Sequence, residues 1–174
     1  MIEHDFVPVM PDGKIDTLVA LLEEEDGLSL VFVRTKRGAD RLARSSHAAA
    51  STSSPCMATW ASHSASARSS ASGSGHATTL IATDVAARGR DLEAIGHVIN
   101  FDPLEDIGYM QRVGKTGRAG RSGRGSTLVL PDQQTDVSRV AVLAGHKEQF
   151  ERTGMRSALP KLVYMSRRGR RSRW

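Results

Sequence analysis

The chain has 174 residues, of which 39% are hydrophobic and 25% are charged. That length suffices for one α/β domain with a substantial core, and the composition is ordinary for a globular protein. The sequence holds no apolar run near the roughly 18 residues that span a bilayer, no secretory signal after Met1, and one cysteine, Cys56. These features exclude a membrane span, an internal disulfide and a multi-cysteine zinc site, so we expect a cytoplasmic protein with no metal site and no membrane partner.

The net charge of +5 comes from the C-terminal tail. The last eight residues hold five arginines: Arg167, Arg168, Arg170, Arg171 and Arg173. Without these five, the numbers of basic and acidic residues are equal. Such a cluster attracts phosphate groups without sequence preference. A solvated tail that only aids solubility is an equally good interpretation.

The first 44 residues alternate predicted strands and helices. Strands are expected over 6–9 and 28–33, and helices over 14–24 and 35–44, where apolar residues recur at helical spacing. The continuous apolar run at 28–33 is typical of a buried parallel strand. Alternation of strand and helix predicts an α/β fold with a parallel sheet.

The pattern breaks over 45–76 and then resumes. Those 32 residues hold 12 serines and 8 alanines, but no Asp, Glu, Leu, Ile or Val. Because such a segment cannot bury enough apolar area to offset its ordering entropy, we expect disorder there. Beyond it, strands are predicted over 79–83, 97–101 and 126–130, and helices over 109–113, 136–144 and 148–152.

Two clusters of arginine and glycine follow predicted strands, at 83–92 (TDVAARGRDL) and 109–121 (YMQRVGKTGRAGR). The carboxyl ends of parallel strands present polar groups to ligands. Glycine allows close approach of the backbone, and guanidinium groups bind phosphate oxygens. This placement favours a phosphate-binding role, in which one arginine stabilises a transferring phosphoryl group, over a basic loop that merely faces solvent.

These residues resemble motifs V and VI of the DEAD-box family of superfamily 2 RNA helicases. Residues 30–35 (LVFVRT) resemble motif IV, and residues 98–102 (VINFD) resemble motif Va. The resemblance runs from residue 2 to residue 131, the serine-rich segment excepted. It implies a RecA-like C-terminal lobe, a parallel sheet flanked by helices, that closes over ATP and RNA held mainly by an N-terminal lobe.

The resemblance assigns nucleotide contacts by position. Asp91 would contact the ribose of ATP, and Arg118 would be the arginine finger on the γ-phosphate. Lys115 stands where the family usually has a second phosphate-contacting arginine, so the charge is kept and the bidentate fork is lost. Gln111 replaces the usual histidine, as in some related helicases, and Arg90 replaces a small or branched apolar residue.

The resemblance also assigns RNA contacts. Thr83, Arg88 and Gly89 match positions that hold the RNA backbone, and Thr35, in motif IV, is expected to join them. Phe32 would pack beneath the arginines of motif VI, although a plain core aromatic is an equally good interpretation.

The triphosphate cradle is not encoded in this sequence. Gly114-Lys115-Thr116 is similar to the end of a phosphate loop, but the nearest upstream glycine, Gly108, is one residue too far away. No Asp-Glu-Ala-Asp sequence occurs either. We therefore expect Mg²⁺ and the phosphate loop to come only through a missing N-terminal lobe, and the chain alone to be inactive; whether it acts as an enzyme is left open.

A shifted reading frame accounts for the composition of 45–76. Between motifs IV and V the family has a strand that ends in a His-Gly-Asp-Met-like sequence, then a helix with a Gln-x-x-Arg pair. In the shifted frame, the third base of each codon is joined to the first two bases of the next codon. Met57 followed by Ala58 then encodes glycine. When GC-favouring third bases are chosen wherever the third base is free, residues 46–69 encode the strand, the His-Gly-Asp-Met sequence and the Gln-x-x-Arg pair in that order. We interpret 45 to about 72 as out of frame, with a genuine Ser/Ala linker as the alternative, and expect the sheet to miss one strand–helix unit, about 45–76.

The predicted organisation has four parts. Residues 1–44 are the first part of the lobe, 45–76 the serine-rich segment, 77–145 the second part with motifs V and VI, and 146–174 a C-terminal extension with the arginine tail. The predicted role is the C-terminal lobe of an ATP-dependent RNA helicase, present here as a fragment. The alternatives are a standalone RNA-binding module and a module that docks onto a separately encoded N-terminal lobe.

Overall fold

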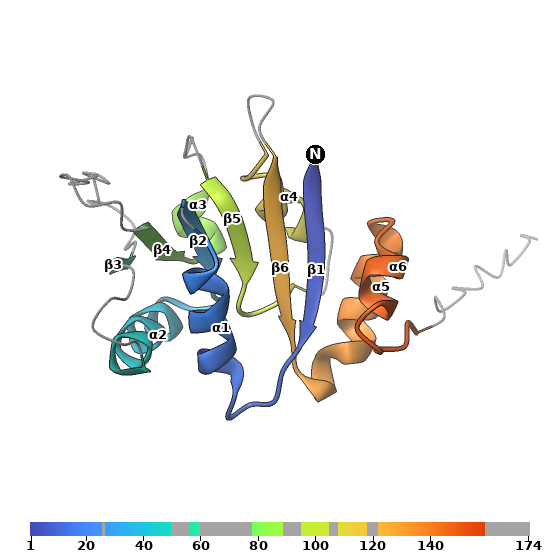
Figure 1. Cartoon of the computed structure of the whole chain (residues 1–174), viewed down its shortest axis with the longest axis horizontal. Coiled ribbons are helices and arrows are strands. Elements are labelled where there is room, and N and C mark those ends of the chain that lie inside the picture. Colours follow the sequence, from blue (N-terminus) through green and yellow to red (C-terminus); the bar gives the residue numbers. More distant parts are fainter. Residues whose placement is uncertain are drawn as a thin grey trace, which may run out of the picture.

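Six strands form one parallel sheet in the order β1-β6-β5-β2-β4-β3 (Figure 1). The computed structural model describes residues 1–25, 27–49, 56–59, 78–88, 95–104, 108–117 and 122–158. The strands are β1 (Ile2–Pro8), β2 (Leu28–Phe32), β3 (Cys56–Thr59), β4 (Thr78–Ala82), β5 (Ile95–Asn100) and β6 (Gly123–Val129). The helices are α1 (Lys14–Glu23), α2 (Lys36–Ala49), α3 (Asp84–Ala87), α4 (Gly108–Val113), the 3-10 turn η2 (Pro131–Gln133), α5 (Gln134–Leu143) and α6 (Lys147–Glu151). The predicted α/β class with a parallel sheet is confirmed.

The central strand β2 is buried on both faces, which explains its unbroken apolar sequence. Side chains alternate along a strand, so Val31 joins the core cluster on one face while Leu30 and Phe32 join the cluster on the other. All three are at most 1% exposed. β2 therefore lies at the centre of the fold and ends at the site described below.

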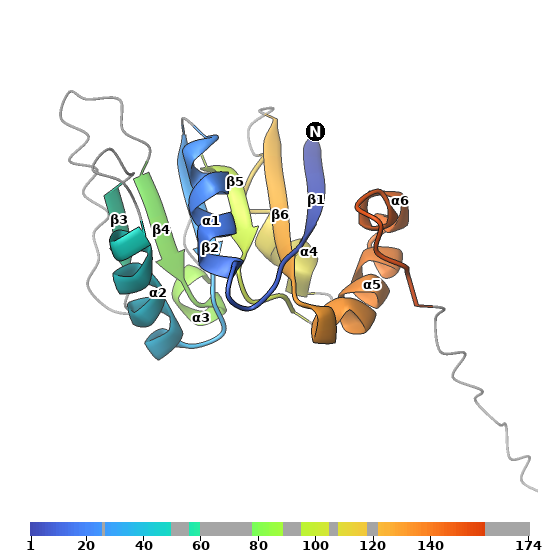
Figure 2. The same ribbon diagram turned by 60° about the horizontal axis from the view of Figure 1, so that its bottom comes forward.

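Helices α1 and α2 cover one face of the sheet (Figure 2). Leu18, Leu21 and Leu22 recur at helical spacing along α1 and pack against the sheet. On the other face, α3 packs against β2, β4 and β5, while α4, α5 and α6 pack against β1 and β6. No helix in the described ranges is long and apolar enough to cross a membrane.

The serine-rich segment contributes more structure than its composition predicts. Helix α2 continues to Ala49, with Ser46 fully buried, and β3 pairs with β4 in parallel register at the edge of the sheet. Alanine favours helix, and an edge strand needs only backbone hydrogen bonds, so neither element requires large apolar side chains. The expected disorder is therefore corrected for 45–49 and 56–59, while 50–55 and 60–77 lie outside the described residues.

Candidate functional site

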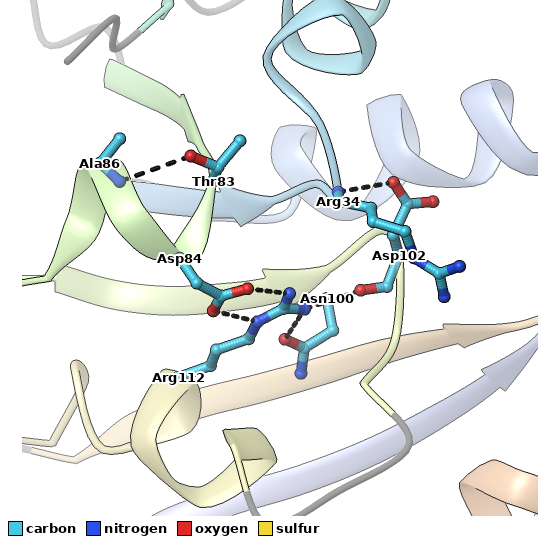
Figure 3. A network of polar contacts seen from close by, with 7 residues as sticks. All are labelled: Arg34, Thr83, Asp84, Ala86, Asn100, Asp102 and Arg112. Carbon is cyan, nitrogen blue, oxygen red and sulfur yellow. Dashed lines mark hydrogen bonds and ion pairs between the residues drawn. The ribbon is translucent and has the colours of Figure 1, made fainter.

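The candidate site lies at the carboxyl ends of the three neighbouring strands β5, β2 and β4 (Figure 3). Each strand is followed there by polar residues: Arg34 after β2, Thr83 and Asp84 after β4, and Asp102 after β5, which itself ends at Asn100. Ligand crevices of open α/β sheets form at such edges, where the strand order reverses.

Arg112, on α4, is the central charged residue of the site. Its side chain is 2% exposed and forms a two-pronged ion pair with Asp84. Nε donates to Oδ1 of Asp84 over 2.7 Å, and Nη2 donates to Oδ2 over 2.5 Å. Paired N–H donors facing paired carboxylate oxygens give the strongest and most directional kind of ion pair, so this contact fixes α4 relative to α3.

The remaining edge of the Arg112 guanidinium also has partners. Nη1 donates to Oδ1 of Asn100 over 3.3 Å and to the backbone oxygen of Asp102 over 2.7 Å. The guanidinium carbon lies 4.9 Å from the centroid of the Phe32 ring. A buried charge is tolerated only when it is paired and hydrogen-bonded, and Arg112 meets both conditions.

Helix α4 is anchored on its far side by Tyr109. The hydroxyl lies 2.7 Å from Nδ1 of His4 on β1, and the His4 ring stacks on His146 with centroids 3.6 Å apart. Burial raises the pKa of Tyr109, whereas burial and then repulsion by His146 lower the pKa of His4 to about 4. At neutral pH the tyrosine hydroxyl is therefore protonated and shares a hydrogen bond with a neutral imidazole.

Asp102 forms a second polar junction beside Arg112. One carboxylate oxygen accepts a hydrogen bond from the backbone N–H of Arg34 over 2.9 Å, and the other lies 3.2 Å from Nζ of Lys14. Lys14 also lies over the Phe101 ring, 4.1 Å from its centroid. These contacts connect α1, the turn after β2 and the end of β5.

A pocket of about 350 Å³ opens beside the Arg112–Asp84 pair. Its lining residues come from β2, α3, α4 and the turns that follow these helices: Phe32, Asp84, Ala87, Arg88, Gln111, Arg112, Gly114 and Lys115. Because Arg112 balances the charge of Asp84, the remaining charge on the lining is positive. A cationic pocket of this kind suits an anionic group such as a phosphate.

The structure brings residues of the two arginine-rich clusters together. Lys115, predicted to contact a phosphate, lines the same pocket as Gln111 and as Arg88, which was predicted to hold the RNA backbone. Phe32 packs against an arginine of the second cluster as expected. Asp91 and Arg118 lie outside the described residues, so the ribose contact and the arginine finger stay predictions.

The predicted RNA contacts are more widely spread. Thr83 precedes α3, and its hydroxyl accepts a hydrogen bond from the Ala86 N–H over 3.4 Å. Thr35 precedes α2, and its exposed side chain accepts from the Gly38 N–H over 3.0 Å. Gly89 lies outside the described residues, as does Arg90.

Sequence reasoning assigned no role to Asp84, Asn100, Asp102 or Arg112. The available signal was their placement: an acid directly after β4, an amide and an acid at the end of β5, and an arginine in the next helix. Polar residues at adjoining strand ends indicate a shared network once the strand order is known.

Comparisons with known proteins agree with this geometry. Residues 13–120 match the family model described as helicase conserved C-terminal domain. The DEAD-box ATP-dependent RNA helicase CshA of Bacillus subtilis is 36% identical over 138 residues, which cover 77% of this chain and 28% of the relative. The ATP-dependent RNA helicase DeaD of Mycobacterium tuberculosis is 38% identical over 106 residues, which cover 60% of this chain and 19% of the relative. The chain thus spans less than a third of the curated relatives it matches.

The chain is also similar in structure to solved RNA helicases and DEAD-box proteins. The E. coli DEAD-box protein SrmB, solved bound to regulator of ribonuclease activity A, aligns over 91% of both chains with a TM-score of 0.62 and 26% identity. A hypothetical ATP-dependent RNA helicase from Sulfolobus tokodaii aligns over 75% of this chain and 38% of its own, with a TM-score of 0.56 and 32% identity. The RecA-like fold expected from the motifs is confirmed.

Proposed function

Because this chain belongs to the helicase conserved C-terminal domain family, we propose that it acts as the C-terminal lobe of an ATP-dependent RNA helicase of the DEAD-box type. In this role it supplies cationic side chains to an ATP site and contacts to the RNA backbone. A second RecA-like lobe supplies the phosphate loop and the carboxylates that bind Mg²⁺.

The observation that carries the proposal is the placement of Lys115 by the Arg112–Asp84 pair. Arg112 lies in the last turn of α4, and the turn 114–117 follows directly. A bidentate ion pair from the buried Arg112 side chain fixes where that turn leaves the helix. Lys115 then lines the pocket together with Arg88, so two cations from separate motifs face one cavity.

Phosphoryl transfer explains why this arrangement suits ATP. In the transition state, negative charge is spread over the oxygens of the transferring phosphoryl group, and positioned cations stabilise it. Lys115 supplies a point charge, and Arg118, three residues further along the sequence, supplies the bidentate arginine finger. Asp91 accepts hydrogen bonds from the ribose hydroxyls, and Mg²⁺ reaches the phosphates through the other lobe.

The RNA backbone is contacted at the strand ends next to this pocket. Hydroxyl and guanidinium groups are common donors to phosphate oxygens. The hydroxyl oxygens of Thr35 and Thr83 accept local backbone hydrogen bonds, which leaves each O–H able to donate to a phosphate. Arg88 is exposed, and Gly89 next to it allows close approach of the RNA backbone.

The test is complementation by the missing half of the ATP site. The purified chain is expected to show no ATPase activity, with or without RNA. Addition of the N-terminal lobe of B. subtilis CshA, in trans or joined by a linker, should produce RNA-stimulated hydrolysis that neither part shows alone. RNA binding without any such stimulation would instead support a standalone RNA-binding module, and would overturn the helicase role.

A further inference from the structure

Lys14 takes no part in the proposed ATP and RNA contacts, yet it is only 8% exposed. Lysine is almost never buried unless its charge is paired. As the first residue of α1, it also lies at the helix end where a positive charge is unfavourable to the helix dipole. Its position is therefore explained by interactions outside its own helix.

Those interactions centre on Asp102. The ammonium group of Lys14 lies 3.2 Å from Oδ1 of Asp102, and the Phe101 ring packs beneath it. The Asp102 side chain is 29% exposed, so the pair is shielded from solvent on most sides. A pair shielded in this way is screened less by salt than a surface pair.

Asp102 in turn holds two parts of the proposed site. Its second carboxylate oxygen accepts the hydrogen bond from the Arg34 N–H, in the turn that carries Thr35. Its backbone oxygen accepts from Nη1 of Arg112, and its backbone N–H donates to the oxygen of Phe32 over 3.2 Å. One residue thus joins the RNA-facing turn after β2 to the arginine that orients α4.

We propose that Lys14 is a positioning residue that, through Asp102, holds the turn after β2 in register with Arg112. Neutralising Lys14 leaves the Asp102 carboxylate without this partner and lets it move toward solvent. The Arg34 N–H then loses its acceptor, and Arg112 loses the backbone oxygen that moves with Asp102. The consequence for RNA-stimulated hydrolysis rests on the proposed function, whereas the positioning itself does not.

The positioning is tested on this chain by amide hydrogen exchange and NMR. Lys14→Met keeps the apolar stem and removes the charge; Lys14→Arg restores the charge. Lys14→Met should speed exchange of the Arg34 amide by about tenfold relative to core strand amides and should shift the Arg112 Nε–H resonance. Lys14→Arg should largely preserve both, and Arg139→Met, which removes the ion pair with Asp136 inside α5, should change neither.

Two outcomes would overturn the positioning role. One is an unchanged Arg34 exchange rate in folded Lys14→Met; the other is a uniform increase at all amides, which means a general loss of stability. Should Lys14→Met fail to fold, Lys14→Gln, which keeps most of the stem without the charge, takes its place in the same comparison.

The functional consequence is measured in the joined two-lobe protein. Lys14→Met should lower RNA stimulation of ATP hydrolysis by roughly tenfold, and Lys14→Arg should restore most of it. If the unmutated two-lobe protein shows no RNA-stimulated hydrolysis, the proposed function fails, and the exchange rate of the Arg34 amide still decides the positioning role. If stimulation is present and Lys14→Met leaves it intact, the link from Lys14 to RNA-stimulated hydrolysis is overturned, while the exchange rate of the Arg34 amide decides the positioning itself.

Discussion

Arg112 and Asp84 are 28 residues apart in the sequence and meet through two N–H···O contacts of 2.7 and 2.5 Å. The contact joins the helix after β5 to the short helix after β4, although β2 lies between those two strands in the sheet. It links the two arginine-rich motifs into one site.

The first prediction concerns this ion pair. Arg112→Met should lower the free energy of unfolding by about 3 kcal/mol, the lower end for a broken buried pair because Asp84 is 39% exposed. Urea unfolding measures the loss. Arg139→Met removes a more exposed pair within one helix and should cost about 0.5 kcal/mol or less. Equal losses in the two variants would contradict the structural role given to Arg112.

The second prediction concerns the lysine in the pocket. Lys115→Arg should raise the RNA-stimulated kcat of the two-lobe protein by a few-fold, because a guanidinium offers two parallel donors to a phosphate and an ammonium does not. Lys115→Met is the matched loss of charge and should lower kcat. If all three proteins hydrolyse ATP at the same rate, Lys115 does not face the phosphates.

The third prediction concerns pH. The pKa of His4 is lowered to about 4 by burial and by repulsion from His146, and that of His97 is lowered to about 4, first by burial and then by Arg124. The unfolded chain binds protons on these rings near pH 6.5 and the folded chain does not, so unfolding takes up about one proton per histidine between pH 6.5 and 4. Stability should be full above about pH 6.5 and should fall as the pH drops toward 4.

The urea midpoint measured across this pH range tests the sign and the source of the effect. His4→Gln should make stability less dependent on pH, because unfolding then takes up about one proton fewer. A variant with the slope of the unmutated chain would show that His4 does not contribute.

The fourth prediction concerns the arginine tail. Deleting 167–174 should remove most nonspecific RNA affinity, because the tail carries the net positive charge of the chain. The log–log salt slope on single strands should fall by roughly 0.7 for each phosphate that the tail neutralises in the full-length chain. Arg88→Gln, a change in the pocket lining, should have a much smaller effect on the slope. If the truncated chain keeps both its affinity and its slope, binding resides in the strand-end loops instead.

Much of the sheet was predictable, and its departures from prediction have local causes. Strand β6 begins at Gly123, three residues before the predicted start. Two glycines interrupt the apolar pattern in this part of the strand, and close packing requires both of them. A Cβ at Gly123 would lie 2.1 Å from Oγ1 of Thr116, and one at Gly125 would lie 2.7 Å from a methyl group of Val113. Helix α3 was missed because four residues are too few to show a helical period.

The site was predictable only in part. The resemblance assigned Arg88 to the RNA backbone and Lys115 to a phosphate of ATP, and the structure places both on the lining of one pocket. The pairing of Arg112 with Asp84 depends on the strand order, which no local pattern reveals. The shifted-frame origin of 45 to about 72 stays a hypothesis, and the nucleotide sequence of the gene tests it.

The central claim is tested most directly by the RNA-stimulated ATPase rate of the joined two-lobe protein with Arg118→Ala. An arginine finger contributes roughly 10³-fold or more to kcat, so a loss of that order is expected while RNA affinity is unchanged. Arg121→Ala, in the same cluster of the sequence (109–121), is the matched control and should retain most of the rate. A rate in Arg118→Ala equal to that of Arg121→Ala would contradict the assignment of this chain as the lobe that supplies the arginine finger.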